Sequence, residues 1–357
     1  MELTHAQSVA IDHVRLKAKE SQSKSIEKMI DIFNRNRISV SIKELLSIIR
    51  TYGRVTFNFH PDRILSNGHT IMECFIEDGM YYSQFVTQVT NGSKTAFAGG
   101  DRDQWEKILF GAAYQNPSVR NVERPKYGGL NLMNYADGAS PRFGSCHFRL
   151  KPHMLECCTF TFGDSHTGPD VMGTIDTFEP IMAALLEVAE INREALGKSD
   201  MDVADVVKQL LTLPSCSGQL GKLGRSLDDY IEAQIHGDID LSKDVEALVA
   251  DPSFKDTQLG VLMEKLCEKY SITLLWHPGF QLAISAVPDD FRGPAMPPLA
   301  KRVDENYAHT SGLLDAVTIG NAAASFYHKP EYWEDWGTPE ETFQHLKQLW
   351  HVLVKYG

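Results

Sequence analysis

The sequence predicts an α+β protein, because helical and strand-like hydrophobic periods occupy separate stretches of the chain. Apolar residues recur at helical spacing in residues 25–52, 177–194 and 201–213. Residues 54–60 and 230–237 instead alternate apolar and polar side chains, which is typical of strands. The chain has 357 residues, 43% of them hydrophobic, which is enough for a substantial core.

The expected elements follow the chain in order. Two helices lie within 25–52, with Ser41 near the start of the second, and a strand over 54–60 stops at Pro61. A β region rich in Gly and aromatic residues extends to about residue 165, before the helices at 177–194 and 201–213. Residues 214–224 are a Gly- and Ser-rich connector, either a flexible surface loop or a lid over a substrate. After the strand at 230–237 we expect helices at 241–250, 260–270 and 339–355, and strands at 272–276 and 281–287.

Composition narrows the classes of function. Lys and Arg number 35 against 47 Asp and Glu, a formal net charge of -12, so nucleic acid is not the expected partner. The six cysteines include no C-x-x-C pair and the histidines show no H-E-x-x-H spacing, so we expect no disulfide scaffold and no metal site. No run of about eighteen apolar residues occurs, so no membrane span is expected. The N-terminus lacks a signal-peptide pattern, which leaves export by a specialised route open.

The most informative segment is residues 230–237. As a strand it places Tyr230, Glu232, Gln234 and His236 on one face and three apolar residues on the other. That polar face either meets water, as one face of an antiparallel sheet commonly does, or belongs to a functional site. A carboxylate, an amide and an imidazole in a row are poorly explained by packing alone.

Other candidate residues cluster at strand ends and turns. His60 and Arg63 follow the first strand, where Arg could bind a phosphate or carboxylate; the alternative is an ordinary turn that pairs Asp62 with Arg63. Two aromatic-glycine turns, which would let a flat ligand stack while the backbone approaches it, carry Tyr127, Gly128, Phe143, Gly144 and Ser145. Asp164 and Ser165 are interpreted as turn-forming residues. Neither a G-x-G-x-x-G nor a P-loop motif occurs.

The order of these motifs resembles the ADP-ribosyltransferase superfamily. The segments FHPDR at 59–63, RPKYGGLN at 124–131, RFGS at 142–145, YIEAQIHG at 230–237 and DPSF at 251–254 look more closely like one bacterial family long catalogued without a function. The resemblance covers about residues 54–302. It implies an ADP-ribosyltransferase-like split β-sheet core at 53–303, with an N-terminal helical region at 1–52 and a C-terminal helical segment at 304–357 packed on the core.

The resemblance also implies a reaction and a set of roles. NAD is the substrate, and Glu232 stabilises the oxocarbenium-like ribose as the nicotinamide leaves, with Gln234 beside it and His236 or a carboxylate as the base. Arg63 would pair with the pyrophosphate and His60 with a ribose hydroxyl, and Tyr127 or Phe143 would stack on the nicotinamide. Some members look like injected effectors that modify a threonine of host ubiquitin and so block ubiquitination. The bacterial cytoplasm before export and the host cytosol after it are the implied locations.

Two departures from the superfamily pattern keep other functions open. Many members carry Glu-x-Glu or Gln-x-Glu with the second residue catalytic, whereas this chain has Glu232-Ala-Gln234. A glutamate expected in residues 83–87 is also missing, with Val86 in its place. The chain could therefore be an inactive relative that acts as a protein-binding module. A third possibility is an NAD glycohydrolase that uses Glu106, Glu232 and a water, although Glu106 also fits the polar face of a helix.

Overall fold

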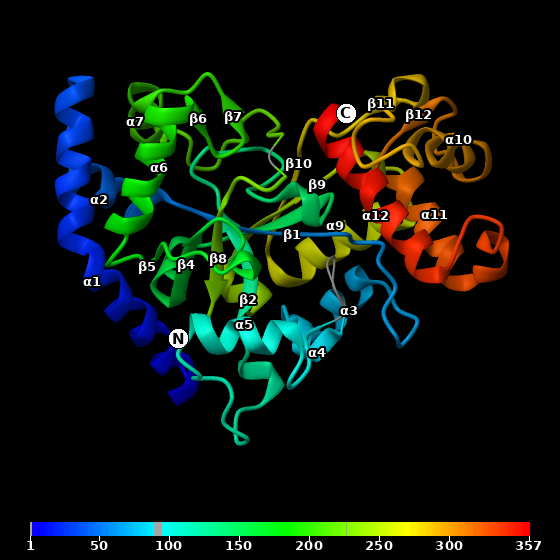
Figure 1. The fold of residues 1–357 in the computed structure, drawn as a ribbon. Helices are drawn as coiled ribbons and strands as arrows, with labels where there is room; N and C mark the ends of the chain where they lie inside the picture. The colour runs from blue at the N-terminus through cyan, green and yellow to red at the C-terminus, as the bar shows by residue number, and fades with distance from the viewer. Residues whose placement is uncertain (1, 89–94, 226) are drawn as a thin grey trace.

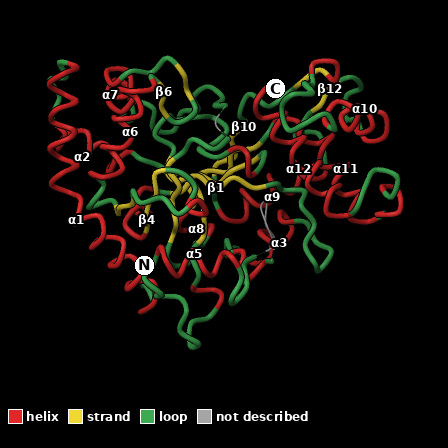
Figure 2. Tube along the Cα trace, viewed as in Figure 1, coloured by secondary structure: helices red, strands yellow, loops and turns green. Residues whose placement is uncertain are grey.

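The structure is a computed structural model that describes residues 2–88, 95–225 and 227–357. A mixed sheet lies at its centre and helices surround it (Figures 1 and 2). The N-terminal helices lie at one side of the sheet and the C-terminal helices at the other, on the left and right of Figure 1. The predicted α+β class is confirmed.

The helices of the described chain are α1 (His5–Asn36), α2 (Ile42–Tyr52), α3 (Ile71–Asp78), α4 (Gln84–Thr87), α5 (Asp101–Leu109), α6 (Glu179–Asn192), α7 (Val203–Thr212), α8 (Leu241–Asp244), α9 (Gln258–Tyr270), α10 (Met296–Tyr307), α11 (Ala316–His328) and α12 (Pro339–Tyr356). Ser41 caps α2 as predicted, its side chain accepting a hydrogen bond from the backbone N–H of Glu44. The β-rich region expected before residue 165 also contains three helices that were not predicted, α3, α4 and α5. The helices α10 and α11 have no predicted counterpart either.

Eight strands form one hydrogen-bonded sheet, whereas the resemblance implied two small sheets. Their spatial order is β10 (Thr273–Trp276), β9 (Val245–Ala250), β3 (Cys146–Leu150), β1 (Val55–Phe59), β2 (Lys126–Leu130), β8 (Ile231–Ile235), β4 (Cys158–Phe162) and β5 (Met172–Thr174). Neighbours are antiparallel except β10 and β9, which are parallel. The strand β8 therefore lies between β2 and β4, inside the sheet, with β4 and β5 between it and the nearer edge.

Both faces of β1 and β8 are buried, although their sequences alternate. The apolar face of β1 packs in the core, where Phe59 contacts Phe148 with ring centroids 4.9 Å apart. Its polar face is covered by the loop before β3: Asn58 donates to the backbone oxygens of Asp137 (2.8 Å) and Gly144 (3.2 Å). Such a covered polar face needs protein partners for every polar group, because buried unpaired groups are costly.

The two terminal helical parts both pack on the central domain. The helices α1 and α2 contact α6, α7 and β5. The helix α12 packs on the short helix η2 (Pro141–Phe143), and the indole of Trp350 donates to the backbone oxygen of Pro141 (2.9 Å). The boundary expected between residues 303 and 304 falls inside α10.

Two predicted elements are wrong. Residues 241–250 are not one helix: they form a single turn, α8, followed by strand β9, which lies between β3 and β10 with buried apolar residues on both faces. A strand buried on both faces reads as a continuous apolar run, which periodicity cannot distinguish from a buried helix. The strand expected at 281–287 shrinks to β11 (Leu282–Ala283), which pairs with β12 (Leu313–Leu314), and a short 3-10 turn follows it.

The connector at 214–224 packs against a loop of the central domain. Gly224 donates its N–H to the Asp137 carboxylate (2.7 Å), and Ala136 donates to the backbone oxygen of Lys222 (3.1 Å). None of the connector residues described lines either of the two large cavities presented below. The arrangement is that of a packed loop and gives no support to a lid.

Candidate functional site

A cavity of about 570 Å³ opens over the middle of the sheet, within the roughly 300–1,000 Å³ typical of ligand sites. Its walls come from segments far apart in the sequence: the end of β1, α3, α5, β2, η2, the turn after β4, β8 and α12. Of the predicted site residues, this first cavity is lined by Tyr127, Gly128, Phe143 and Glu232.

Glu232 is the buried carboxylate of the first cavity, with 5% of its surface exposed. Its Oε1 accepts a hydrogen bond from Gln234 Nε2 (2.9 Å), and its Oε2 lies 3.3 Å from the Tyr230 hydroxyl. Burial, and next the negative charge of Asp164, raise the pKa of Glu232 to about 7, while hydrogen bonds from Ser165 and Gln234 and the charge of Arg102 act in the opposite direction. The polar face of β8 is thus buried in the protein, and the water-facing interpretation is wrong.

Asp164 and Ser165 also line the first cavity, beside Glu232. Asp164 does cap the short helix η4 (Ser165–Thr167), accepting from the backbone N–H of His166 (3.0 Å), so its predicted turn role is confirmed. The same turn places its carboxylate near Arg142, 3.9 Å away, and within the electrostatic reach of Glu232. The sequence does not indicate that Asp164 acts on Glu232, because a turn-forming Asp gives no information about which residues the turn contacts.

Aromatic rings form another part of the wall. Phe143 meets Tyr230 edge to face with ring centroids 6.2 Å apart, and the Arg142 guanidinium lies 4.7 Å from the Phe143 ring centre. On β2, the ring centre of Tyr127 lies 4.5 Å from the guanidinium of Arg102, which belongs to α5. Rings with a flanking cation and a nearby carboxylate suit a flat, polar ligand.

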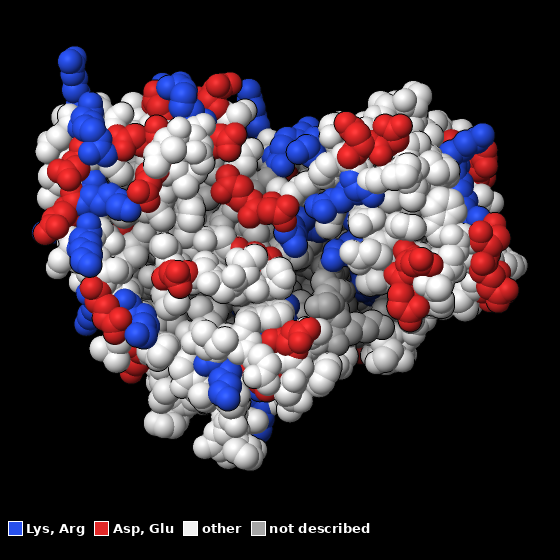
Figure 3. All heavy atoms as spheres, in the orientation of Figure 1, with Lys and Arg blue, Asp and Glu red and all other residues white. Residues whose placement is uncertain are grey.

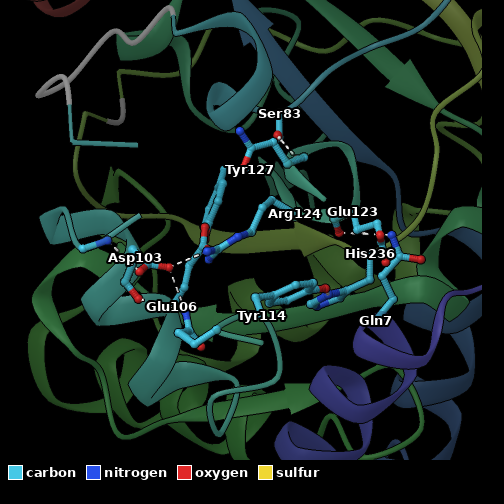
Figure 4. A network of polar contacts seen from close by, with 12 residues as sticks. Gln7, Ser83, Asp103, Glu106, Tyr114, Glu123, Arg124, Tyr127 and His236 are labelled. Carbon is cyan, nitrogen blue, oxygen red and sulfur yellow. Dashed lines mark hydrogen bonds and ion pairs between the residues drawn. The ribbon is translucent and has the colours of Figure 1, made fainter. Parts of the chain in front are cut away.

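A buried ion network holds Tyr127 in place (Figure 4). The Tyr127 hydroxyl donates to Glu106 Oε1 (2.6 Å), and the Arg124 guanidinium binds Glu106 Oε2 (2.8 Å) and Asp103 Oδ1 (2.5 Å). Glu106 is fully buried and does not line either cavity. Glu106 does lie on a helix, α5, as the alternative interpretation had it, but its side chain faces the interior and not the solvent.

Gln234 and His236 lie in the protein interior next to the first cavity and line neither cavity. The Thr159 hydroxyl donates to Gln234 Oε1 (2.7 Å), so its oxygen accepts from His236 Nε2 (3.0 Å). The other ring nitrogen of His236 then accepts from the Tyr114 hydroxyl (2.5 Å). Burial, and next the charge of Lys126, lower the pKa of His236 to about 3, so the imidazole is neutral. A neutral ring with both nitrogens engaged is not available as a base.

His60 and Arg63 line a second cavity, of about 340 Å³, rather than the first. The His60 ring meets Trp350 edge to face at 4.9 Å, and the Arg63 guanidinium lies 5.2 Å from the Phe343 ring centre. The two cavities adjoin, because Ser66, Thr87, Arg142 and Lys347 line both. Residues 61–62 form the expected turn, and the charge of Arg63 acts to lower the pKa of Asp62, against the effect of burial, but no ion pair within 4 Å joins the two side chains in the described structure.

The glycines of the two turns allow close packing against β1. A Cβ on Gly128 would lie 2.5 Å from the backbone oxygen of Thr56, and one on Gly144 would lie 2.0 Å from the carbonyl carbon of Phe59. The close backbone approach predicted for these glycines is thus an approach to a neighbouring strand. Gly144 and the buried Ser145 line neither cavity.

Positive charge collects where the two cavities meet. Burial, together with the charges of Arg142, Arg292 and Arg63, lowers the pKa of Lys347, so the three arginines lie within electrostatic reach of this lysine. Among the residues described, Arg63, Arg292 and Lys347 form no ion pair. Lys and Arg side chains gather along the hollow between the C-terminal helices and the rest of the molecule (Figure 3). Uncompensated cations at a cavity suit an anionic ligand.

No cluster of three or more His, Cys, Asp or Glu that could hold a metal ion occurs in the described ranges. Within the same ranges, no helix is long and apolar enough to cross a membrane.

Comparison with known proteins gives a family but no function. A search of curated proteins found no match. The model of a family described as "Protein of unknown function (DUF3626)" matches residues 54–356. The match begins just before β1 and ends in α12, so it includes both cavities and leaves out α1 and α2. The chain therefore belongs to the DUF3626 family.

Proposed function

We propose that this protein is a mono-ADP-ribosyltransferase that cleaves the nicotinamide–ribose bond of NAD and transfers ADP-ribose to a protein side chain. The observation that carries the proposal is Glu232, a buried carboxylate that lines a cavity walled by aromatic rings and bordered by uncompensated cations. A dinucleotide offers a matching set of groups: a flat cationic ring, a ribose that becomes positively charged as the bond breaks, and a pyrophosphate.

The chemistry follows from these groups. The bond between the ribose C1′ and the nicotinamide nitrogen breaks, its electron pair leaves with the nicotinamide, and positive charge develops on the ribose. The ionised Glu232 would stabilise that charge across a short distance in a site of low dielectric. Tyr127 and Phe143 would hold the nicotinamide ring, and Arg102 is placed to repel a cationic nicotinamide that is not yet cleaved.

The acceptor must lose a proton as its oxygen attacks C1′. Asp164 is the group best placed to take that proton, because its carboxylate lines the same cavity as Glu232. The resemblance makes a threonine of ubiquitin the first acceptor to test, with loss of ubiquitination as the consequence. It also gives the proposed setting, a bacterial effector that is exported by a specialised system and acts in the host cytosol.

The other two functions have less support. A glycohydrolase that uses Glu106 would need that carboxylate at the substrate, and it is instead enclosed by Arg124 and Tyr127. A binding module that has lost catalysis does not need a cavity carboxylate with a pKa near neutrality, whereas such a group is typical of a catalytic site. Glu-x-Gln in place of Glu-x-Glu is consistent with Glu232 as the active carboxylate, because only the first residue lines the cavity.

The test is intact mass spectrometry of ubiquitin and of a cell-lysate fraction, each incubated with NAD and the protein. We expect a gain of one ADP-ribose with wild type and with Glu268→Gln, an exposed control on α9, and no gain with Glu232→Gln. Released nicotinamide is measured in parallel. Untouched NAD with wild type would end the proposal, and free ADP-ribose without any modified protein would replace it with a hydrolase.

A further inference from the structure

We propose that the second cavity binds the adenosine end of a nucleotide whose phosphates lie at the junction of the two cavities. This inference rests on the proposed function and extends it to the C-terminal helices. The cavity lies between the end of β1 and the helices α11 and α12, and its walls are mostly apolar.

The walls suit a purine base. Four aromatic residues line the cavity: Phe326, Tyr327, Phe343 and Trp350. Between them α11 presents small side chains, including Ala323, and leaves an open volume of about 340 Å³. A flat base buried among aromatic and aliphatic side chains gains stacking as well as apolar burial.

The cavity also has a buried carboxylate that could bind the donors of a nucleoside. Asp62 lines the cavity, and no described side chain donates a hydrogen bond to its carboxylate. Burial raises the pKa of Asp62 to about 6, while the charge of Arg63 and a backbone hydrogen bond act in the opposite direction. A ribose hydroxyl or an exocyclic amine would supply such a donor.

The junction suits phosphates. Arg142 and Lys347 line both cavities, and Arg63 lines the second beside them. Among the described residues Lys347 forms no ion pair, and Arg63 feels the charge of Asp62 without forming a close ion pair with it, so a phosphate group would give both cations a direct anionic partner. Because Glu232 lines the first cavity and these cations stand between, a dinucleotide across the junction would direct its nicotinamide half toward Glu232. A fatty chain or an apolar peptide would use the walls but not the cations.

The experiment measures binding, so it does not depend on catalysis. ADP, adenosine and nicotinamide mononucleotide are titrated calorimetrically into wild type and variants. Ala323→Trp fills the second cavity, Asn321→Trp places the same ring on the exposed side of α11, and Lys347→Gln removes one junction charge.

We expect ADP to bind wild type about tenfold or more tightly than adenosine, because of its phosphates. Ala323→Trp should lose both ligands and keep nicotinamide mononucleotide, and Asn321→Trp should behave as wild type. Lys347→Gln should weaken ADP and leave adenosine unchanged. If Ala323→Trp does not fold, Phe343→Ala, which removes one ring of the wall, should weaken adenosine.

Either of two results would overturn the inference: no ADP binding to wild type at millimolar concentration, or ADP binding that survives Ala323→Trp. The proposed function fails independently. ADP that binds while nicotinamide is never released from NAD leaves the nucleotide site standing without the transferase. Nicotinamide release without ADP binding leaves the transferase standing without this site.

Discussion

Gln234 donates a hydrogen bond from Nε2 to the Oε1 of Glu232, 2.9 Å away, two residues earlier on the same face of β8. It is the last link of a buried chain in which every donor points toward the carboxylate. Tyr114 donates to His236, His236 to Thr159, Thr159 to Gln234, and Gln234 to Glu232. Aligned hydrogen bonds polarise one another, so the chain favours the ionised form of Glu232.

Breaking the chain should raise the pKa of Glu232 further. We expect Gln234→Leu to lower nicotinamide release about tenfold at pH 7 and to move the acidic limb of the pH–rate profile upward, because a donor to the carboxylate is lost. Thr159→Val, one link further away, should move the limb less in the same direction. Gln209→Leu on α7 is the control. A rate loss without any movement of the limb would indicate general damage to the site instead.

The pH dependence of wild type should reflect the ionisation of Glu232. Its pKa of about 7 is raised by burial and by Asp164 and lowered by Arg102, Ser165 and Gln234, while Tyr127 and Tyr230 are neutral there. Nicotinamide release should therefore rise through pH 7. Asp164→Asn should shift this limb to lower pH and still release nicotinamide, but transfer to protein should fall. Asp170→Asn, an exposed control in the same loop, should change neither the pH of this limb nor the transfer to protein. If Asp164→Asn left the limb at the same pH, the charge of Asp164 would not act on Glu232.

Glu232→Gln should make the protein more stable at alkaline pH. The folded state holds the proton of Glu232 up to about pH 7, against 4.5 for an ordinary glutamate, so its stabilising contribution is complete below pH 4.5 and is lost as the pH rises through 7. Above pH 8 the variant should gain about 1–3 kcal/mol of unfolding free energy over wild type. Urea unfolding at pH 5 and pH 8.5 measures this gain, with Glu268→Gln as control. Equal stability at both pH values would argue against a raised pKa.

Loss of Arg124 should be among the most damaging single changes. Its guanidinium neutralises Glu106 and Asp103 in the interior, and removal leaves a buried carboxylate uncompensated. Arg124→Gln should cost about 3–5 kcal/mol of unfolding free energy. Arg120→Gln removes a cation of the same loop that is largely exposed and should cost about 1 kcal/mol or less. Thermal unfolding of the two variants side by side compares them, and similar losses would contradict the role assigned to the network.

The sequence by itself determined the α+β class, six of the twelve described α-helices, the strand that carries Glu232 and the choice of that glutamate as the candidate carboxylate. These rest on local periodicity, which a single segment encodes. The common face of Glu232 and Gln234 on β8 also follows from this periodicity, because residues two apart on a strand share a face. Local pattern failed at β9, because a strand buried on both faces has no alternation.

Only the tertiary structure decided which residues and cavities surround the polar faces of these strands. It separated His60 and Arg63 from Glu232 into an adjoining cavity, and it brought Asp164 to Glu232. It also enclosed His236, a candidate base in the sequence, in a buried hydrogen-bond chain. The physical reason is that burial and the neighbours across a sheet set the charge and the reach of a polar group. Both depend on strand order and on distant helices such as α12, about which the neighbouring residues in the chain carry no information.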